Sequence, residues 1–219
     1  MICAEQFQAY AAEGYNRIPV VREVLSDLDT PLSVYLKLAD GPNTYLFESV
    51  EGGETWGRYS IIGLPAKRSF VFRGHQLEEQ EFGETIDART LEDPLEYVDV
   101  LRARYRVPKL DGLPDFSGGL VGYFGFETIA WIEPKLKMAD KPDYMDAPDA
   151  LLLLSEEVAV FDNLKGRLYL IVHADPAEPQ AYAKAQRRLD ELVYRLRQSG
   201  RSYPDVLHPS ILNEVDFVS

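Results

Sequence analysis

Cysteine and histidine are scarce in this sequence. Its 219 residues contain one cysteine, Cys3, and three histidines that lie far apart, His75, His173 and His208. A single cysteine excludes an internal disulfide, and histidines this scattered give no Cys/His ligand spacing for a metal ion. We therefore expect a reducing, cytoplasmic compartment and no Cys/His metal site.

Positive charge and long apolar runs are also lacking. The chain carries 23 Lys and Arg against 36 Asp and Glu, a formal net charge of -13, and no cluster of Lys and Arg stands out. Such a surface repels phosphate backbones, so we expect no nucleic acid partner. The apolar runs are far shorter than a membrane-spanning helix, and no basic segment precedes a long apolar one at the amino terminus. Neither membrane anchoring nor export is therefore expected.

Apolar residues make up 46% of the chain, which is enough for a sizeable core in a globular protein. Their spacing predicts helices over residues 4–12, 31–38, 94–105 and 177–198. Thr30-Pro31 and Asp93-Pro94 each place a capping side chain before a proline that suits the first helical position. In the helix that begins at Pro31, Leu32, Tyr35, Leu36 and Ala39 form the predicted apolar face.

The predicted strands follow one another as hairpins. Apolar runs at 18–24, in the stretch 45–63, at 69–77 and at 150–161 with 167–173 are separated by turn residues, and an acidic run after 77 has the pattern of a solvated outer strand. Because strands do not alternate with helices, we expect an α+β fold with a largely antiparallel sheet and helices on one face. Residues 1–200 are predicted to form this domain, and 201–219 a linker.

The segment from 116 to 131 places glycines among aromatic residues. Four glycines in one strand-like segment, Gly118, Gly119, Gly122 and Gly125, predict bulges or a close approach of two backbones. Their spacing does not match a dinucleotide-binding fingerprint. We therefore expect this segment to serve packing under a neighbouring sheet rather than to bind a ligand.

No complete active site is predicted from the residues alone. Ser49, Ser60 and Ser117 lack the strained turn of a catalytic nucleophile, and His75 and His173 lie in strand patterns. The aspartates spaced by three between 143 and 149 lack the turn glycine and the closing glutamate of a calcium loop. The sequence instead favours a domain that has no catalytic centre of its own.

Several segments together resemble a known family. Leu46-Phe47-Glu48-Ser49, Gly57-Arg58-Tyr59-Ser60-Ile61-Ile62-Gly63 and Gly118 to Glu127 are similar to the amino-terminal region of anthranilate synthase component I, the chorismate-using subunit of tryptophan biosynthesis. The similarity continues through Asp29 to Lys37 and Glu157 to Asp162. It therefore covers most of the chain.

The resemblance implies that this chain is part of a longer protein. In the family, the residues that bind chorismate and magnesium, including a catalytic histidine and metal-ligating glutamates, belong to a carboxy-terminal region that nothing here resembles. We therefore expect no catalytic residue and no metal ligand in this chain, which alone would be inactive. The full protein would form anthranilate and pyruvate from chorismate, using ammonia from a glutamine amidotransferase subunit and magnesium.

The resemblance also implies an effector site for tryptophan. Carried over by position, Ser49 would hydrogen-bond the effector and Glu48 would hold its amino group, with Leu46, Arg58 and Ser60 close by. An amino acid effector needs a carboxylate for its ammonium, donors for its carboxylate and an apolar slot for its ring. On the residues alone, however, Glu48 and Ser49 also fit the polar end of an edge strand.

Two other functions fit the same motifs. The aminodeoxychorismate synthase component of folate synthesis has a similar fold and a similar strand pair. A module without catalysis that only docks an amidotransferase is the alternative from another class. The product that the full chain forms distinguishes anthranilate synthase from the folate enzyme. Titration with tryptophan distinguishes an effector-binding domain from a module that only docks an amidotransferase.

Overall fold

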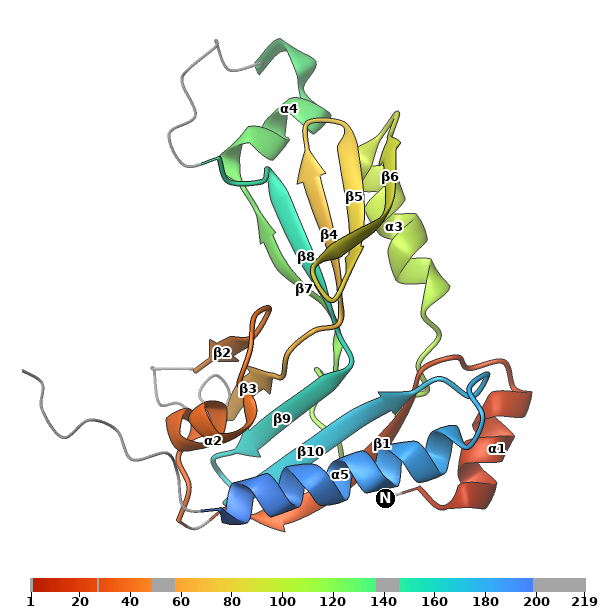
Figure 1. Ribbon diagram of the computed structural model, residues 1–219, viewed down its shortest axis with the longest axis vertical. Helices are drawn as coiled ribbons and strands as arrows, with labels where there is room; N and C mark the ends of the chain where they lie inside the picture. The colour runs from red at the N-terminus through yellow and green to blue at the C-terminus, as the bar shows by residue number, and fades with distance from the viewer. Residues whose placement is uncertain (1, 27, 49–57, 137–145, 199–219) are drawn as a thin grey trace, which may run out of the picture.

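The strands of the chain form two separate sheets. The computed structural model describes residues 2–26, 28–48, 58–136 and 146–198. Figure 1 shows the two sheets one above the other, joined by several crossings of the chain. Each sheet has five strands, and every pairing between them is antiparallel. The predicted α+β class and antiparallel pairing are thus confirmed, whereas the division into two sheets was not evident from strand patterns.

The first sheet has the strand order β1-β10-β9-β3-β2. Its strands are β1 (Ile18–Leu25), β10 (Arg167–Ala174), β9 (Glu157–Asp162), β3 (Tyr59–Gly63) and β2 (Tyr45–Phe47). Helices α1 (Ala4–Ala12), α2 (Pro31–Leu38) and α5 (Ala181–Arg197) contribute apolar side chains to its main core. A smaller cluster on its other face includes Val160 and Ile171, with Leu113 and Phe116 packed against it. The first sheet is therefore covered on both faces.

The second sheet has the order β6-β5-β4-β8-β7. Its strands are β6 (Glu84–Thr90), β5 (Gln76–Glu81), β4 (Arg68–Arg73), β8 (Ala150–Ser155) and β7 (Gly119–Phe124). Helix α3 (Pro94–Arg104) packs Tyr97 and Leu101 against Phe70 and Phe72. Three short helical segments follow β7, namely η1 (Phe126–Thr128), α4 (Ile129–Ile132) and η2 (Pro134–Leu136). This sheet thus has its own apolar core.

One apolar run of the sequence serves both sheets. Residues 150–161 have the pattern of a single strand, but the chain leaves the second sheet after Ser155 and enters the first at Glu157. β8 pairs with β4 and β7, and β9 pairs with β10 and β3. The predicted hairpin of residues 150–161 with 167–173 is confirmed only for its second half, because β9 pairs with β10 whereas β8 belongs to the second sheet. The junction at Ser155 to Glu157 therefore links the two sheets through a continuous backbone.

The predicted helix starts are confirmed. The Oγ1 of Thr30 accepts the N–H of Ser33 at 3.1 Å, and Asp93 Oδ1 accepts the N–H of Leu95 at 2.8 Å. These side chains satisfy N–H groups that have no partner within the helix. The same local chemistry that defines the caps in the sequence therefore forms in the structure.

The predicted apolar face of α2 is only partly confirmed, because Tyr35 packs against the main core but the two predicted leucines do not. Val34 and Leu38 are fully buried, whereas Leu32 is 53% exposed and Leu36 is 41% exposed. Val34 and Leu38 also lie four residues apart, so they form an equally regular helical stripe. α2 contacts α5 and β3, and this packing selects the stripe that faces the core.

The acidic run after residue 77 does not form an outer strand. Glu78, Glu79 and Glu81 belong to β5, which pairs with β4 on one side and β6 on the other. Glu79 is buried and lies 3.4 Å from the guanidinium of Arg68. The outer strand is β6, whose sequence ETIDART has too few apolar residues to be detected by periodicity.

Candidate functional site

The predicted effector residues that the structure describes lie within or directly beside the pair of strands β2 and β3, at an edge of the first sheet. Leu46 lies opposite Ile62, and Phe47 opposite Ile61, while β3 continues the sheet onto β9. Side chains alternate between the two faces of a strand, so neighbouring residues of this pair point in opposite directions. The strand pair therefore presents different chemistry on its two faces.

One face of the pair is closed by the main core. Leu46 packs against the cluster that α2 and α5 share with the first sheet. Ser60 is only 2% exposed, and its Oγ accepts a hydrogen bond of 3.2 Å from Nδ2 of Asn163. Both predicted residues are thus held within the fold, on strands that lie side by side.

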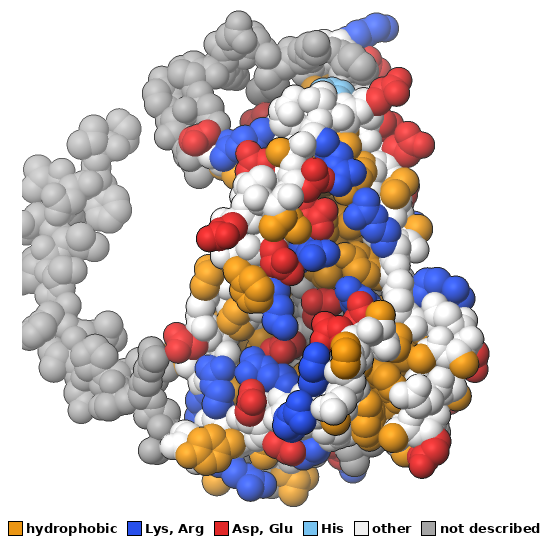
Figure 2. All heavy atoms as spheres, turned by 45° about the vertical axis from the view of Figure 1, so that its right-hand side comes forward, with side chains coloured by type: hydrophobic (Ala, Val, Ile, Leu, Met, Phe, Trp, Pro, Cys, Tyr) orange, Lys and Arg blue, Asp and Glu red, His pale blue; other side chains and the backbone are white. Residues whose placement is uncertain are grey.

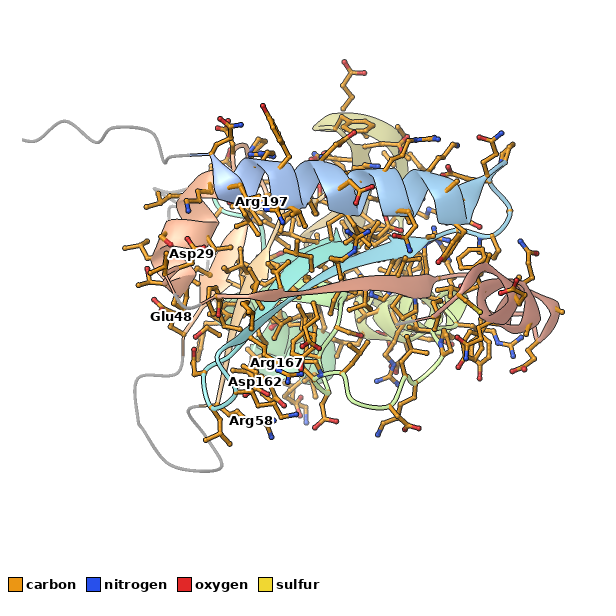
Figure 3. The ribbon with its side chains drawn as sticks, turned by 90° about the horizontal axis from the view of Figure 1, so that it is seen from below. Asp29, Glu48, Arg58, Asp162, Arg167 and Arg197 are labelled. Carbon is orange, nitrogen blue, oxygen red and sulfur yellow. The ribbon has the colours of Figure 1, made fainter. Side chains whose placement is uncertain are left out.

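Arg58 is engaged with a buried carboxylate. Its Nε donates to Oδ1 of Asp162 at 3.0 Å and its Nη2 to Oδ2 at 2.6 Å, a bidentate pair. Asp162 is 1% exposed and also accepts the N–H of Lys165 at 3.2 Å. The guanidinium lies over the ring of Tyr59, 4.9 Å from its centre. Figure 3 shows Arg58 and Asp162 next to each other, on the side of the first sheet away from α5.

This pairing shifts the titration of both groups. Burial by itself would raise the pKa of Asp162, but hydrogen bonds from Arg58 and from the Lys165 N–H, with the charges of both residues, lower it below its usual value. The hydrogen bond to Asp162 raises the pKa of Arg58. Asp162 therefore stays ionised, and Arg58 is committed to it.

The remaining predicted residues lie at the carboxyl end of β2. Glu48 follows the last residue of β2 and is exposed. Ser49 lies outside the residues that the structure describes. The structure thus brings Leu46 and Ser60 onto adjacent strands, places Glu48 at the end of one of them, and directs Arg58 to Asp162.

A groove of about 820 Å³ in the described part of the chain runs between the two sheets, beside α5. Its lining includes the apolar residues Val172 and Ala185 and the charged residues Lys184, Arg188 and Glu157. Arg188 and Glu157 bind each other through contacts of 2.8 to 3.1 Å, and Figure 2 shows acidic and basic side chains mixed over one face of the molecule. Of the predicted effector residues that the structure describes, none lines this groove.

Comparison with known proteins decides the relationship. No family model matches the chain. It is 52% identical over 194 residues to anthranilate synthase component 1 of Pseudomonas aeruginosa, covering 89% of this chain and 39% of that protein. The same protein of Neisseria meningitidis serogroup C is 50% identical over 202 residues, covering 91% of this chain and 41% of its own. The chain is homologous to part of anthranilate synthase component 1. The resemblance predicted from the motifs is confirmed.

A solved structure has the same fold. Anthranilate synthase component I of Streptococcus pneumoniae matches with a TM-score of 0.53 and 24% identity, over 81% of this chain and 37% of that chain. The chain spans about two fifths of the length of the anthranilate synthase component 1 sequences that it matches. Its fold and its sequence relatives agree.

Two residues of the strand pair's surroundings were not predicted as part of the site. Asp162 ends β9 and was assigned to the turn before β10, and Ser155 ends β8. Asp162 lies 104 positions from its partner Arg58 in the sequence. Ser155 lies 110 positions from Tyr45, with which its hydroxyl forms a hydrogen bond. No local pattern can indicate contacts at such separation. For Asp162, the only signal in the sequence was an aspartate at the end of an apolar strand.

The described residues show neither a metal centre nor a membrane helix. In the parts of the chain that the structure describes, no group of three or more His, Cys, Asp or Glu side chains could hold a metal ion. Within the same residues, no helix is both long enough and apolar enough to cross a bilayer. Asp146, one of the aspartates between 143 and 149, pairs with Arg73 at 3.0 Å.

Proposed function

We propose that this chain acts within a longer protein that forms anthranilate and pyruvate from chorismate and ammonia, and that it contributes the response to tryptophan. The observation that carries this proposal is the 52% identity to anthranilate synthase component 1 over 89% of the chain. A glutamine amidotransferase subunit would supply ammonia to the longer protein. Chorismate and magnesium are proposed to bind in the remainder of the longer protein.

The effector is proposed to bind at the carboxyl end of β2. The exposed carboxylate of Glu48 suits the ammonium group of an amino acid, and Ser49 is proposed to hydrogen-bond the effector. The bidentate contact of Arg58 with Asp162 leaves this guanidinium committed within the fold. The donors for the effector's carboxylate are therefore proposed to come from other groups, including those of the longer protein.

The activity is tested with a protein of the relatives' length that contains this chain. Supplied with chorismate, an ammonium salt and magnesium, it is expected to form anthranilate, which is followed by its fluorescence. Glutamine is expected to replace ammonium only when an amidotransferase subunit is present. The chain of 219 residues alone is expected to form no product.

Two results would contradict this proposal. Formation of aminodeoxychorismate in place of anthranilate would assign the longer protein to folate synthesis. Turnover of chorismate by the 219-residue chain alone would show that it holds a catalytic centre.

Tryptophan is expected to inhibit the longer protein, and Glu48→Gln is expected to weaken that inhibition by roughly tenfold or more, because it removes the partner of the effector's ammonium.

A further inference from the structure

Tyr45 connects the edge of the first sheet to the second sheet. It is the first residue of β2, and its hydroxyl lies 2.8 Å from Oγ of Ser155. Ser155 is the last residue of β8, is 2% exposed, and belongs to the second sheet. This single hydrogen bond therefore joins the strand that precedes Glu48 to the junction between the sheets.

The ring of Tyr45 is fixed in place by its cross-strand neighbour. Gly63 lies opposite Tyr45 in the β2–β3 ladder. A Cβ atom at Gly63 would lie 2.0 Å from Cε1 of Tyr45, so the ring occupies the space that any other residue would fill. The ring of Phe47 lies 4.9 Å away on the same face. Burial raises the pKa of Tyr45 to about 12, so its hydroxyl keeps its proton at neutral pH.

Ser155 lies in tightly packed surroundings. A Cβ atom at Gly118 would lie 2.8 Å from the carbonyl oxygen of Ser155 and 2.6 Å from Nε2 of His173. Glu156, which follows Ser155, is held twice. Its backbone carbonyl accepts a hydrogen bond from the N–H of His173 at 2.8 Å, and its Oε1 accepts one from Nε of Arg17 at 2.6 Å. A movement of the Tyr45 hydroxyl therefore meets a backbone that has little freedom to yield.

We propose that Tyr45 is a positioning residue that couples the β2–β3 strand pair to the junction between the two sheets. On this view, which rests on the proposed function, an effector bound at the end of β2 shifts that strand, and the hydroxyl of Tyr45 carries the shift to Ser155. An effector changes activity only through a difference in affinity between two states. On this proposal, the hydrogen bond between Tyr45 and Ser155 is the contact that differs between the two states.

The test uses the longer protein and two matched substitutions. Tyr45→Phe removes the hydroxyl and keeps the ring over Gly63. Tyr35→Phe is the control. The hydroxyl of Tyr35 also forms a hydrogen bond with another hydroxyl, Oγ1 of Thr44 at 2.9 Å, but this contact lies just before β2 and within the layer of the first sheet. Calorimetry measures the affinity for tryptophan with and without chorismate, and initial rates measure kcat and KM.

The ratio of the two tryptophan affinities measures the coupling. Tyr45→Phe is expected to reduce this ratio by about tenfold, while the affinity for tryptophan alone and the uninhibited kcat change by less than about threefold. Tyr35→Phe is expected to keep the ratio. An unchanged ratio in Tyr45→Phe, or an equal loss in both variants, would overturn the role of Tyr45. If tryptophan does not inhibit the unsubstituted protein, the proposed function itself fails, and the role of Tyr45 fails with it.

Discussion

Replacing Gly122 with alanine is expected to lower the free energy of unfolding by roughly 3 kcal/mol or more. A Cβ atom at Gly122 would lie 1.8 Å from the carbonyl oxygen of Leu151 and 2.8 Å from its carbonyl carbon. Both atoms belong to the backbone of β8, which pairs with β7 through Gly122 and Leu152. No side-chain rotation relieves this overlap, so β7 has to separate from β8 and lose ladder hydrogen bonds.

Denaturant unfolding followed by circular dichroism measures this effect, and Gly119→Ala is the matched control. Gly119 lies in the same strand at a φ of +134°, and a Cβ atom there would meet nothing within 4 Å. That variant suffers only the backbone penalty of a non-glycine residue at this φ, roughly 1–3 kcal/mol. Equal losses in the two variants would show that β7 shifts to make room for the methyl group at Gly122.

Arg58→Leu is expected to destabilise the chain far more than Arg167→Leu. The first change leaves the carboxylate of Asp162, which is 1% exposed, without its bidentate partner, and a buried charge without a partner is costly. Arg167 pairs with Glu23 at 2.7 Å, but these side chains are 45% and 38% exposed. An exposed pair of this kind contributes about 0–1 kcal/mol. Thermal unfolding midpoints at neutral pH compare the two variants.

Arg58→Leu is also expected to change how the stability of the chain depends on pH. In the unsubstituted chain the lowered pKa of Asp162 contributes stability that is fully present at neutral pH and is lost as the pH falls through the acid range. Without Arg58, only the Lys165 N–H and charge oppose the effect of burial, so the pKa of Asp162 is expected to rise relative to the unsubstituted chain. The difference in stability between Arg58→Leu and the unsubstituted chain should therefore shrink as the pH falls from neutral into the acid range. A difference that stays constant would show that Asp162 does not depend on Arg58.

Local signals in the sequence predict local structure well. The starts of α2 and α3 follow from a capping side chain and a proline, because both act within a few residues of each other. Gly122 predicted a close backbone approach, which the contact with Leu151 confirms. Features that depend on what an element packs against were less accessible, as the buried stripe of α2 shows.

Contacts between distant segments could not be predicted from the sequence. The apolar run 150–161 has one strand period throughout, and only the polar residues Ser155 to Glu157 mark the change of sheet. Likewise, Arg58 was predicted from family resemblance as an effector residue, and its partner Asp162 follows only from the fold that brings β3 beside β9. The effector role of Ser49, Glu48, Leu46 and Ser60 stays a prediction.

The pairing of β1 with β10 affects the order in which the chain can fold during its synthesis. Ile18 lies opposite Ala174, so β1 leaves the ribosome long before its partner is made. At roughly 5–20 residues per second, β1 remains without its partner for on the order of ten seconds. Pro19 lies within β1 and has no N–H that could pair with another chain before β10 is made. The position of this proline at the edge of the sheet therefore protects the nascent chain as well as the finished fold.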